Sequence, residues 1–183
     1  MNIVLETERC LLREMDPADG VTMYELNSDP LVIRYTGDPP FENAEAATEF
    51  LRRYDAYRKF GMGRWAVVKK DDQQILGWCG LKFLADEDEV DLGYRFFRKY
   101  WGQGYATETA LACIKYGFEN LHLNRIIGRA AVENIASVRV LEKCGLKFDC
   151  FNKHFGDDSV QHVISKAEYH GWKRLHFGSP SLL

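Results

Sequence analysis

The sequence predicts an α/β (α+β) domain in which strands and helices are intermixed along one chain. Two observations support this fold class. Residues 90–97 alternate apolar and polar side chains, which is the period of a half-buried strand. A glycine-rich turn at residues 102–104 leads directly into residues 106–121, whose apolar side chains are spaced for one face of a helix. At 183 residues the chain suits one domain, predicted to span residues 1–177 with a disordered tail at 178–183.

Composition argues against several classes of protein. Hydrophobic residues make up 46% and charged residues 28% of the chain, which is enough apolar material for a core. No apolar run reaches the length of a membrane span, and the first residues lack a basic region followed by an apolar stretch, so we expect a cytoplasmic protein without a membrane partner. A net charge of −3 argues against direct nucleic-acid binding. The five cysteines show neither paired nor metal-ligand spacing, which predicts free thiols and no metal site.

The first third of the chain predicts two helices joined by a loop. Asp16 is a helix cap and Pro17 takes the first helical position, and this helix should run to about Asn27. The second helix should span residues 44–60 and end at the glycine that follows. Residues 31–40 between them are rich in turn formers and predict a loop.

The remaining elements are predicted from alternation, helical spacing and caps. Gly93, inside one of the strands, is a candidate bulge that would part this strand from its neighbour. In order, we expect a hairpin of strands 64–69 and 75–83, a strand over 89–96 after the acidic turn 86–88, a helix over 107–120, a strand over 125–132, a short helix after Asn134, strands over 146–152 and 161–165, and a last helix opened by the capping box of Ser165 and Glu168.

The turn at residues 102–107 is the main functional signal. A glycine turn that feeds into a helix leaves backbone N–H groups unpaired at the positive end of the helix, which suits a phosphate or pyrophosphate. A dinucleotide fingerprint would need glycine or alanine where Thr107 stands and an acidic residue after a second strand, whereas Glu119 falls inside the helix. A P-loop would need lysine where Ala106 stands. Both alternatives fit badly, so we expect a phosphorylated cofactor of another kind.

Four segments carry a resemblance to a known family. They are Thr-Glu-Arg-Cys-Leu-Leu-Arg at 7–13, Asp-Leu-Gly-Tyr at 91–94, Tyr-Trp-Gly-Gln-Gly-Tyr-Ala-Thr-Glu at 100–108, and 134–146 with Asn134, Ser137 and a Glu-Lys-Cys-Gly-Leu ending. Together they resemble the GNAT superfamily of N-acetyltransferases, and within it the ribosomal-protein N-terminal (alanine/serine) acetyltransferase subgroup. The resemblance implies a mixed, mostly antiparallel central sheet of six to seven strands flanked by helices, in which a splayed strand pair binds acyl-CoA.

The same resemblance implies the activity. Acetyl-CoA would be the co-substrate, and the acetyl group would pass to a primary amine, in the first place a protein N-terminal α-amine. Two alternatives stay open: a small-molecule amine such as a polyamine, amino acid or aminoglycoside, and a non-catalytic acyl-CoA-binding module. The sequence leaves open whether the protein is a monomer or a homodimer, and whether loop 31–40 shapes the acceptor site or only packs on the core.

Acetyl transfer requires a neutral amine, so a carboxylate that assists deprotonation is expected. Asp91 is the candidate base, because its strand flanks the expected gap and its position resembles that of the family's strand acid. Pairing with Arg95 or another cation would instead make Asp91 a structural residue. Glu14 and His162 are weaker candidates for the base.

The departing thiolate must also be stabilised. Many GNAT enzymes use a tyrosine where this chain has Leu141, and Ser137 resembles the substitute of the subgroup, although it would serve equally as a first-turn cap. Asn134 is a helix cap whose side chain would also face the cofactor. The resemblance assigns oxyanion stabilisation to a backbone N–H between residues 95 and 97. The predicted cofactor-binding residues are Arg95, Phe96, Phe97, Gly102, Gln103, Gly104, Tyr105, Ala106, Thr107, Asn134 and Lys143.

Overall fold

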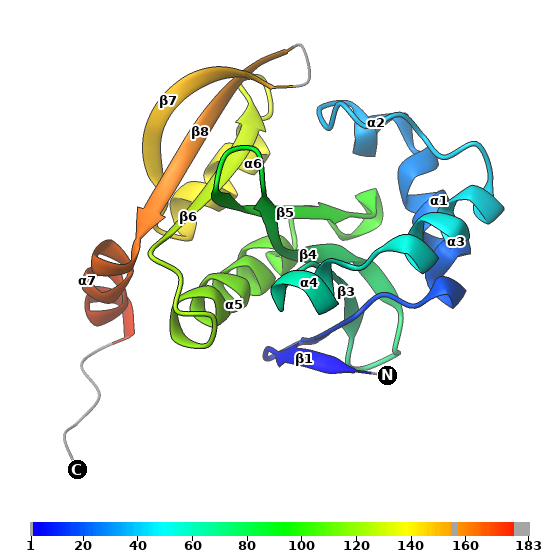
Figure 1. Cartoon of the computed structure of the whole chain (residues 1–183), viewed down its shortest axis with the longest axis horizontal. Helices are drawn as coiled ribbons and strands as arrows, with labels where there is room; N and C mark the ends of the chain where they lie inside the picture. The colour runs from blue at the N-terminus through cyan, green and yellow to red at the C-terminus, as the bar shows by residue number, and fades with distance from the viewer. Residues whose placement is uncertain (1, 155–156, 178–183) are drawn as a thin grey trace.

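The protein folds as one eight-stranded sheet covered by helices, seen in a computed structural model that describes residues 2–154 and 157–177 (Figure 1). The predicted tail at 178–183 lies outside the described residues. The strands lie in the order β1-β2-β3-β4-β5-β6-β8-β7. They are β1 (Ile3–Glu6), β2 (Cys10–Arg13), β3 (Arg64–Lys69), β4 (Ile75–Leu84), β5 (Glu89–Phe96), β6 (Arg125–Ala131), β7 (Lys147–His154) and β8 (Asp157–Ser165).

Seven α-helices are present in the described residues. Helices α1, α2 and α3 gather at one end of the molecule, whereas β6, β7 and β8 lie at the other (Figure 1). The helices are α1 (Gly20–Ser28), α2 (Pro30–Ile33), α3 (Ala44–Arg53), α4 (Ala56–Phe60), α5 (Tyr105–Glu119), α6 (Ile135–Lys143) and α7 (Lys166–Phe177), and short 3₁₀ turns lie at Pro17–Asp19 and Arg98–Tyr100.

The sheet is divided between β5 and β6. These two strands are parallel and pair at a single position, Asp91 with Ile127, whereas every other neighbouring pair is antiparallel. The predicted mixed, mostly antiparallel sheet with one parted pair is therefore confirmed. The strand count is eight because the opening segment folds as the hairpin of β1 and β2.

The predicted bulge at Gly93 is wrong. The β4–β5 ladder keeps its register from Gly77 opposite Phe96 to Leu84 opposite Glu89, with Gly80 directly opposite Gly93. A Cβ on Gly93 would lie 2.6 Å from the guanidinium carbon of Arg64. A side chain here would therefore displace the Arg64 guanidinium, which crosses the strand, and the parting of the sheet occurs on the other edge of β5.

Alternation along the strands separates two apolar clusters on opposite faces of the sheet. On one face, α5 packs through Ile114 and Phe118 against residues such as Leu81. On the other face, α1 and α3 form a smaller cluster around Leu26 and Leu51. Between this smaller cluster and the sheet lies the space in which the site is found.

The helix predicted over residues 44–60 is broken into α3 and α4. Tyr54 has an extended backbone (φ −74°, ψ 97°) that ends α3. The break lets two phenols hold the start of β3: the Arg64 N–H donates to the Tyr54 hydroxyl at 2.9 Å, and the Tyr57 hydroxyl donates to the Arg64 carbonyl. A second difference is α2, a helical turn inside the predicted loop, which is capped by the Asp29 side chain.

The remaining helices agree closely with the sequence. Helix α5 begins at Tyr105, two residues before the predicted start, and α6 begins directly after Asn134. The Ser165–Glu168 capping box opens α7, with the Glu168 carboxylate accepting from the Ser165 N–H at 3.0 Å. Within residues 2–154 and 157–177, no helix has the length and apolar character needed to cross a membrane.

Candidate active site

The glycine turn presents unpaired donors at the start of α5. Gly102 and Gly104 have φ of 73° and 82°, a left-handed conformation that favours glycine. The first backbone bond of the helix runs from the Glu108 N–H to the Gly104 carbonyl at 3.0 Å. The N–H groups of residues 105–107 therefore point out of the helix end without intrahelical acceptors, as an anion site requires.

An ion pair anchors this turn to the opening hairpin. The Glu108 carboxylate accepts from the Thr7 hydroxyl at 2.7 Å, and from the N–H and Nε of Arg9 at 2.9 and 2.6 Å. Arg9 also donates to the Gln103 carbonyl at 3.0 Å. Burial opposes ionisation of Glu108, yet these hydrogen bonds outweigh it and hold its pKa below the ordinary value. The opening segment, noted in the sequence only for its resemblance, thus fixes the shape of the turn.

The parted edge of β5 leaves one of the three predicted oxyanion donors exposed to the gap. The Phe97 N–H already donates to the Leu76 carbonyl at 3.0 Å. Since hydrogen-bonding sides alternate along an antiparallel ladder, the Arg95 N–H also faces β4, and the Phe96 N–H faces the open side. The Phe96 carbonyl on that side accepts from the Trp101 indole at 2.8 Å. Phe96 is therefore the donor that the geometry favours.

Ser137 lies across the gap from β5, next to Tyr94. The hydroxyls of Ser137 and Tyr94 are 2.9 Å apart, and the Tyr94 hydroxyl also lies 2.9 Å from the Ser137 carbonyl. Burial raises the pKa of Tyr94, so this phenol stays protonated. The cap of α6 uses the Asn134 side chain, which accepts from the Ser137 backbone N–H at 3.2 Å. The Ser137 hydroxyl takes no part in that cap.

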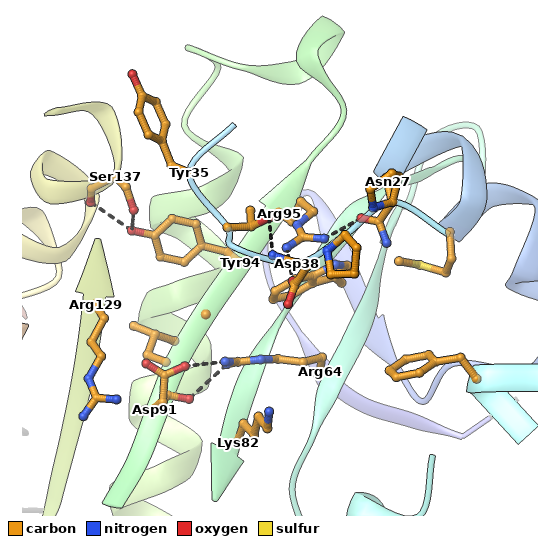
Figure 2. Close-up of a pocket in the computed structure, with 18 of the residues that line it drawn as sticks. Asn27, Tyr35, Asp38, Arg64, Lys82, Asp91, Tyr94, Arg95, Arg129 and Ser137 are labelled. Carbon is orange, nitrogen blue, oxygen red and sulfur yellow. Dashed lines mark hydrogen bonds and ion pairs between the residues drawn. The ribbon is translucent and has the colours of Figure 1, made fainter. Parts of the chain in front are cut away.

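Asp91 is paired with a cation, which is Arg64 and not Arg95 (Figure 2). Arg64 donates through Nη2 to Oδ2 of Asp91, and through Nη1 to the carbonyls of Gly80 and Asp91 at 2.6 and 3.0 Å. The guanidinium carbon also lies 5.3 Å from the ring centre of Trp78. Oδ1 of Asp91 has no hydrogen-bond partner within the described part of the chain, and it is the oxygen left to interact with a substrate or water.

Arg64, Asp91, Tyr94 and Ser137 line a cavity of about 640 Å³ between the sheet and the segment from Tyr35 to Glu42, whereas Phe96 and the turn at 102–107 are not part of its lining. Buried Arg95 ties that segment to the sheet by donating to Asp38 at 2.6 Å and to the side chain of Asn27 (Figure 2). The charged side chains that line the cavity are four cations, Arg64, Lys82, Arg95 and Arg129, and three carboxylates, Asp38, Glu42 and Asp91.

The weaker candidates lie elsewhere. Glu14 binds the Asn2 side chain at 3.0 Å and does not line the cavity. His162 is 3% exposed, and burial lowers its pKa, with Phe148 stacked edge-on against its ring. Lys143 is exposed on the last turn of α6. No group of three His, Cys, Asp or Glu side chains suited to a metal is found in residues 2–154 and 157–177.

Sequence reasoning missed Arg64, Lys82, Tyr94 and Arg129 as site residues. The signal that could have indicated Arg64 and Lys82 was strand alternation combined with the hairpin register. This register sets Arg64 opposite Gly80 and Lys82 opposite Asp91, so all four residues share one face of the sheet. Arg129 belongs to a strand separated from β5 by a helix, so local sequence carried no signal for it.

Comparisons with known proteins show what the chain is similar to. A family model described as "Acetyltransferase (GNAT) domain" matches residues 9–147. The chain is 32% identical over 176 residues to the uncharacterized N-acetyltransferase p20 of Bacillus licheniformis, across 91% of this chain and 98% of that protein.

Two solved structures share the fold. An acetyltransferase of the GNAT family from Bacillus anthracis has a TM-score of 0.77 and 28% identity, covering 91% of this chain and 99% of its own. Spermidine N-acetyltransferase from Vibrio cholerae, solved in complex with CoA and spermine, has a TM-score of 0.77 and 20% identity, covering 88% of this chain and 98% of its own. At that identity the likeness concerns the fold alone.

Replacing Gly104 by valine should weaken acetyl-CoA binding. The side chain would stand where a phosphate must approach the backbone N–H groups, and losing such charge-assisted contacts costs about 10- to 100-fold in affinity. Gly61→Val is the matched control, because Gly61 has a similar φ of 66° but caps α4, away from the turn. Calorimetry with the folded variants tests this. Unchanged affinity in Gly104→Val would remove the turn from the cofactor site.

Proposed function

The chain belongs to the GNAT family of acetyltransferases, and on this premise we propose that it transfers an acetyl group from acetyl-CoA to the α-amine at the N terminus of a protein. Acetyltransferases of this family use acetyl-CoA. The observation that supports an α-amine acceptor is the charge of the cavity beside the parted strands: three of its four cations are paired with carboxylates, whereas Lys82 has no counterion in residues 2–154 and 157–177.

The cofactor would lie along the division of the sheet. Its pyrophosphate would bind the N–H groups at the start of α5, together with the turn held by Arg9 and Glu108. The pantetheine arm would run between β5 and β6, where the strands are no longer paired. The acetyl carbonyl would then reach the Phe96 N–H, and the sulfur would reach the start of α6.

The reaction requires three groups. The amine nitrogen attacks the acetyl carbon, and its proton leaves through a chain of waters in the cavity to Oδ1 of Asp91. The developing oxyanion accepts a hydrogen bond from the Phe96 N–H. As the C–S bond breaks, the thiolate accepts a hydrogen bond from the Ser137 hydroxyl, while Tyr94, 2.9 Å from that hydroxyl, holds it in place.

The charge of the cavity favours an amine that is easily deprotonated. Nearby cations disfavour the ammonium form and lower the pKa of a bound amine. An α-amine, with an ordinary pKa of about 7.7–8.0, then loses its proton readily, whereas a lysine-like amine near 10.4 does not. A polyamine carries further ammonium groups, which the Lys82 ammonium would repel. Spermidine is therefore a poor fit, although the spermidine enzyme of Vibrio cholerae shares the fold.

An acceptor panel tests the proposal. CoA release from acetyl-CoA is measured with N-terminal peptides, free amino acids and spermidine at equal concentrations. We expect turnover on the peptides and none on spermidine. Turnover on spermidine alone would overturn the assignment of the acceptor. Tight acetyl-CoA binding with no turnover on any amine would contradict catalysis and favour a binding module.

Ser137→Ala should lower kcat and leave the affinity for acetyl-CoA unchanged, because the hydroxyl acts only as charge develops on sulfur. A group that donates a hydrogen bond without full proton transfer should cost at most about 10²-fold. The helix cap survives, since it uses the backbone N–H. Steady-state kinetics and calorimetry on the same preparation separate the two quantities. Equal kcat in both proteins, with chemistry shown to be rate-limiting, would exclude a role for the hydroxyl.

Asp91→Asn should reduce the rate most at low pH, with partial recovery as the pH rises. The amide keeps the shape and an acceptor for Arg64, but it cannot take a proton; at higher pH the amine loses its proton without help. A lysine-like acceptor should suffer a larger loss than an α-amine, because its pKa is higher. A pH–rate profile that overlays the wild type would leave Asp91 as the structural partner of Arg64.

A further inference from the structure

One cation of the cavity has no counterion in the described part of the chain. Arg64 pairs with Asp91, Arg95 pairs with Asp38, and Arg129 pairs with Glu87. Lys82 is exposed at the rim of the cavity and makes no hydrogen bond or ion pair with any residue in 2–154 and 157–177. Figure 2 shows its side chain extending toward the pair formed by Arg64 and Asp91.

Lys82 lies next to the candidate base. The two residues are directly opposite in the β4–β5 register, so both side chains stand on the same face of the sheet. Directly opposed residues in an antiparallel pair have Cβ atoms about 4.5–5.5 Å apart. An acceptor in this cavity that extends from the acetyl carbon toward Asp91 therefore brings groups near its amine toward the Lys82 ammonium.

Lys82 stands too far from the glycine turn to bind the cofactor phosphates. Asp91, opposite Lys82, is five residues before Phe96, a span of about 16 Å along a strand. The turn at 102–104 follows only after Phe96, on the far side of that strand end. The charge of Lys82 is therefore available to the acceptor and not to the pyrophosphate.

A second cation faces the same space from the other half of the sheet. Arg129, on β6, lines the cavity and feels the charge of Asp91, which together with its hydrogen bonds to Glu87 raises its pKa. Its side chain is 11% exposed and also donates to the Gln161 side chain at 2.9 Å, so its position is fixed. An anion between Lys82 and Arg129 would meet the ammonium of Lys82 on one wall and, on the other, a guanidinium whose charge is shared with Glu87.

We propose that the acceptor carries a carboxylate close to its reactive amine, and that Lys82, supported by the field of Arg129, binds this carboxylate. The inference rests on the proposed acetyl transfer to an α-amine and specifies which acceptors are used. Two sources supply the same chemistry: a peptide with Asp or Glu near its N terminus, and a free acidic amino acid. The ammonium of Lys82 forms a charge-assisted hydrogen bond with either.

The test compares pairs of acceptors that differ by one charge. Peptides that begin Ala-Asp and Ala-Glu are compared with Ala-Asn and Ala-Gln, and free aspartate is compared with asparagine, by kcat/KM for CoA release. The wild type should prefer the acid in each accepted pair by about ten-fold. Lys82→Gln should bring the acid-to-amide ratio of kcat/KM close to one, Lys82→Arg should keep the preference, and Lys82→Glu should favour Ala-Lys peptides.

Lys115→Gln is the matched control, because Lys115 is exposed on α5 and does not line the cavity; it should behave as the wild type. Turnover of free amino acids but not of peptides would overturn the proposal that the acceptor is a peptide. The carboxylate site would still be tested by the comparison of free aspartate with asparagine. No turnover on any α-amine would overturn both. An acid-to-amide ratio near one in the wild type, or a ratio unchanged in Lys82→Gln, would overturn the role of Lys82.

Discussion

The parting of β5 from β6 is the constraint on which the rest of the site depends. Each strand is fully bonded on its other edge, β5 to β4 and β6 to β8, so each half of the sheet is stable without the seam between them. One pair, Asp91 with Ile127, joins the strands before they separate. Backbone groups such as the Phe96 N–H then lack strand partners, which costs free energy unless a ligand or water pairs with them.

The second determinant is the way the sheet holds an arginine on its surface. Gly80 and Gly93 face each other in the β4–β5 register, and the absence of side chains leaves a path for Arg64 to reach Asp91. Removing these charges from water is costly, and the hydrogen bonds to two carbonyls and the carboxylate offset that cost. The ion pair is neutral overall and leaves Oδ1 of Asp91 without a hydrogen-bond partner among the described residues, facing the cavity.

Much of the fold follows from local sequence. The turn at 102–104 and the Asn134 cap of α6 were predictable because glycine φ values and caps depend on a few adjacent residues. The break in the predicted 44–60 helix was not, since it is stabilised by Tyr54 and Tyr57 hydroxyls that bind Arg64 on a later strand. The bulge predicted at Gly93 was wrong for a similar reason. Gly93 leaves room for the Arg64 side chain, which comes from another strand, and a local sequence pattern cannot show such a contact.

The sequence by itself determined the order of most elements, the glycine turn and two chemically suitable groups, Asp91 and Ser137, because these depend on residue type and on spacing along the chain. Only the tertiary structure decided their surroundings. It joined Asp91 to Arg64, brought Tyr94 to Ser137 across the seam and left Lys82 without a counterion among the residues that the structure describes. Charge and hydrogen bonding act through distances of a few ångströms, and such distances between separate strands and helices are fixed by how the elements pack.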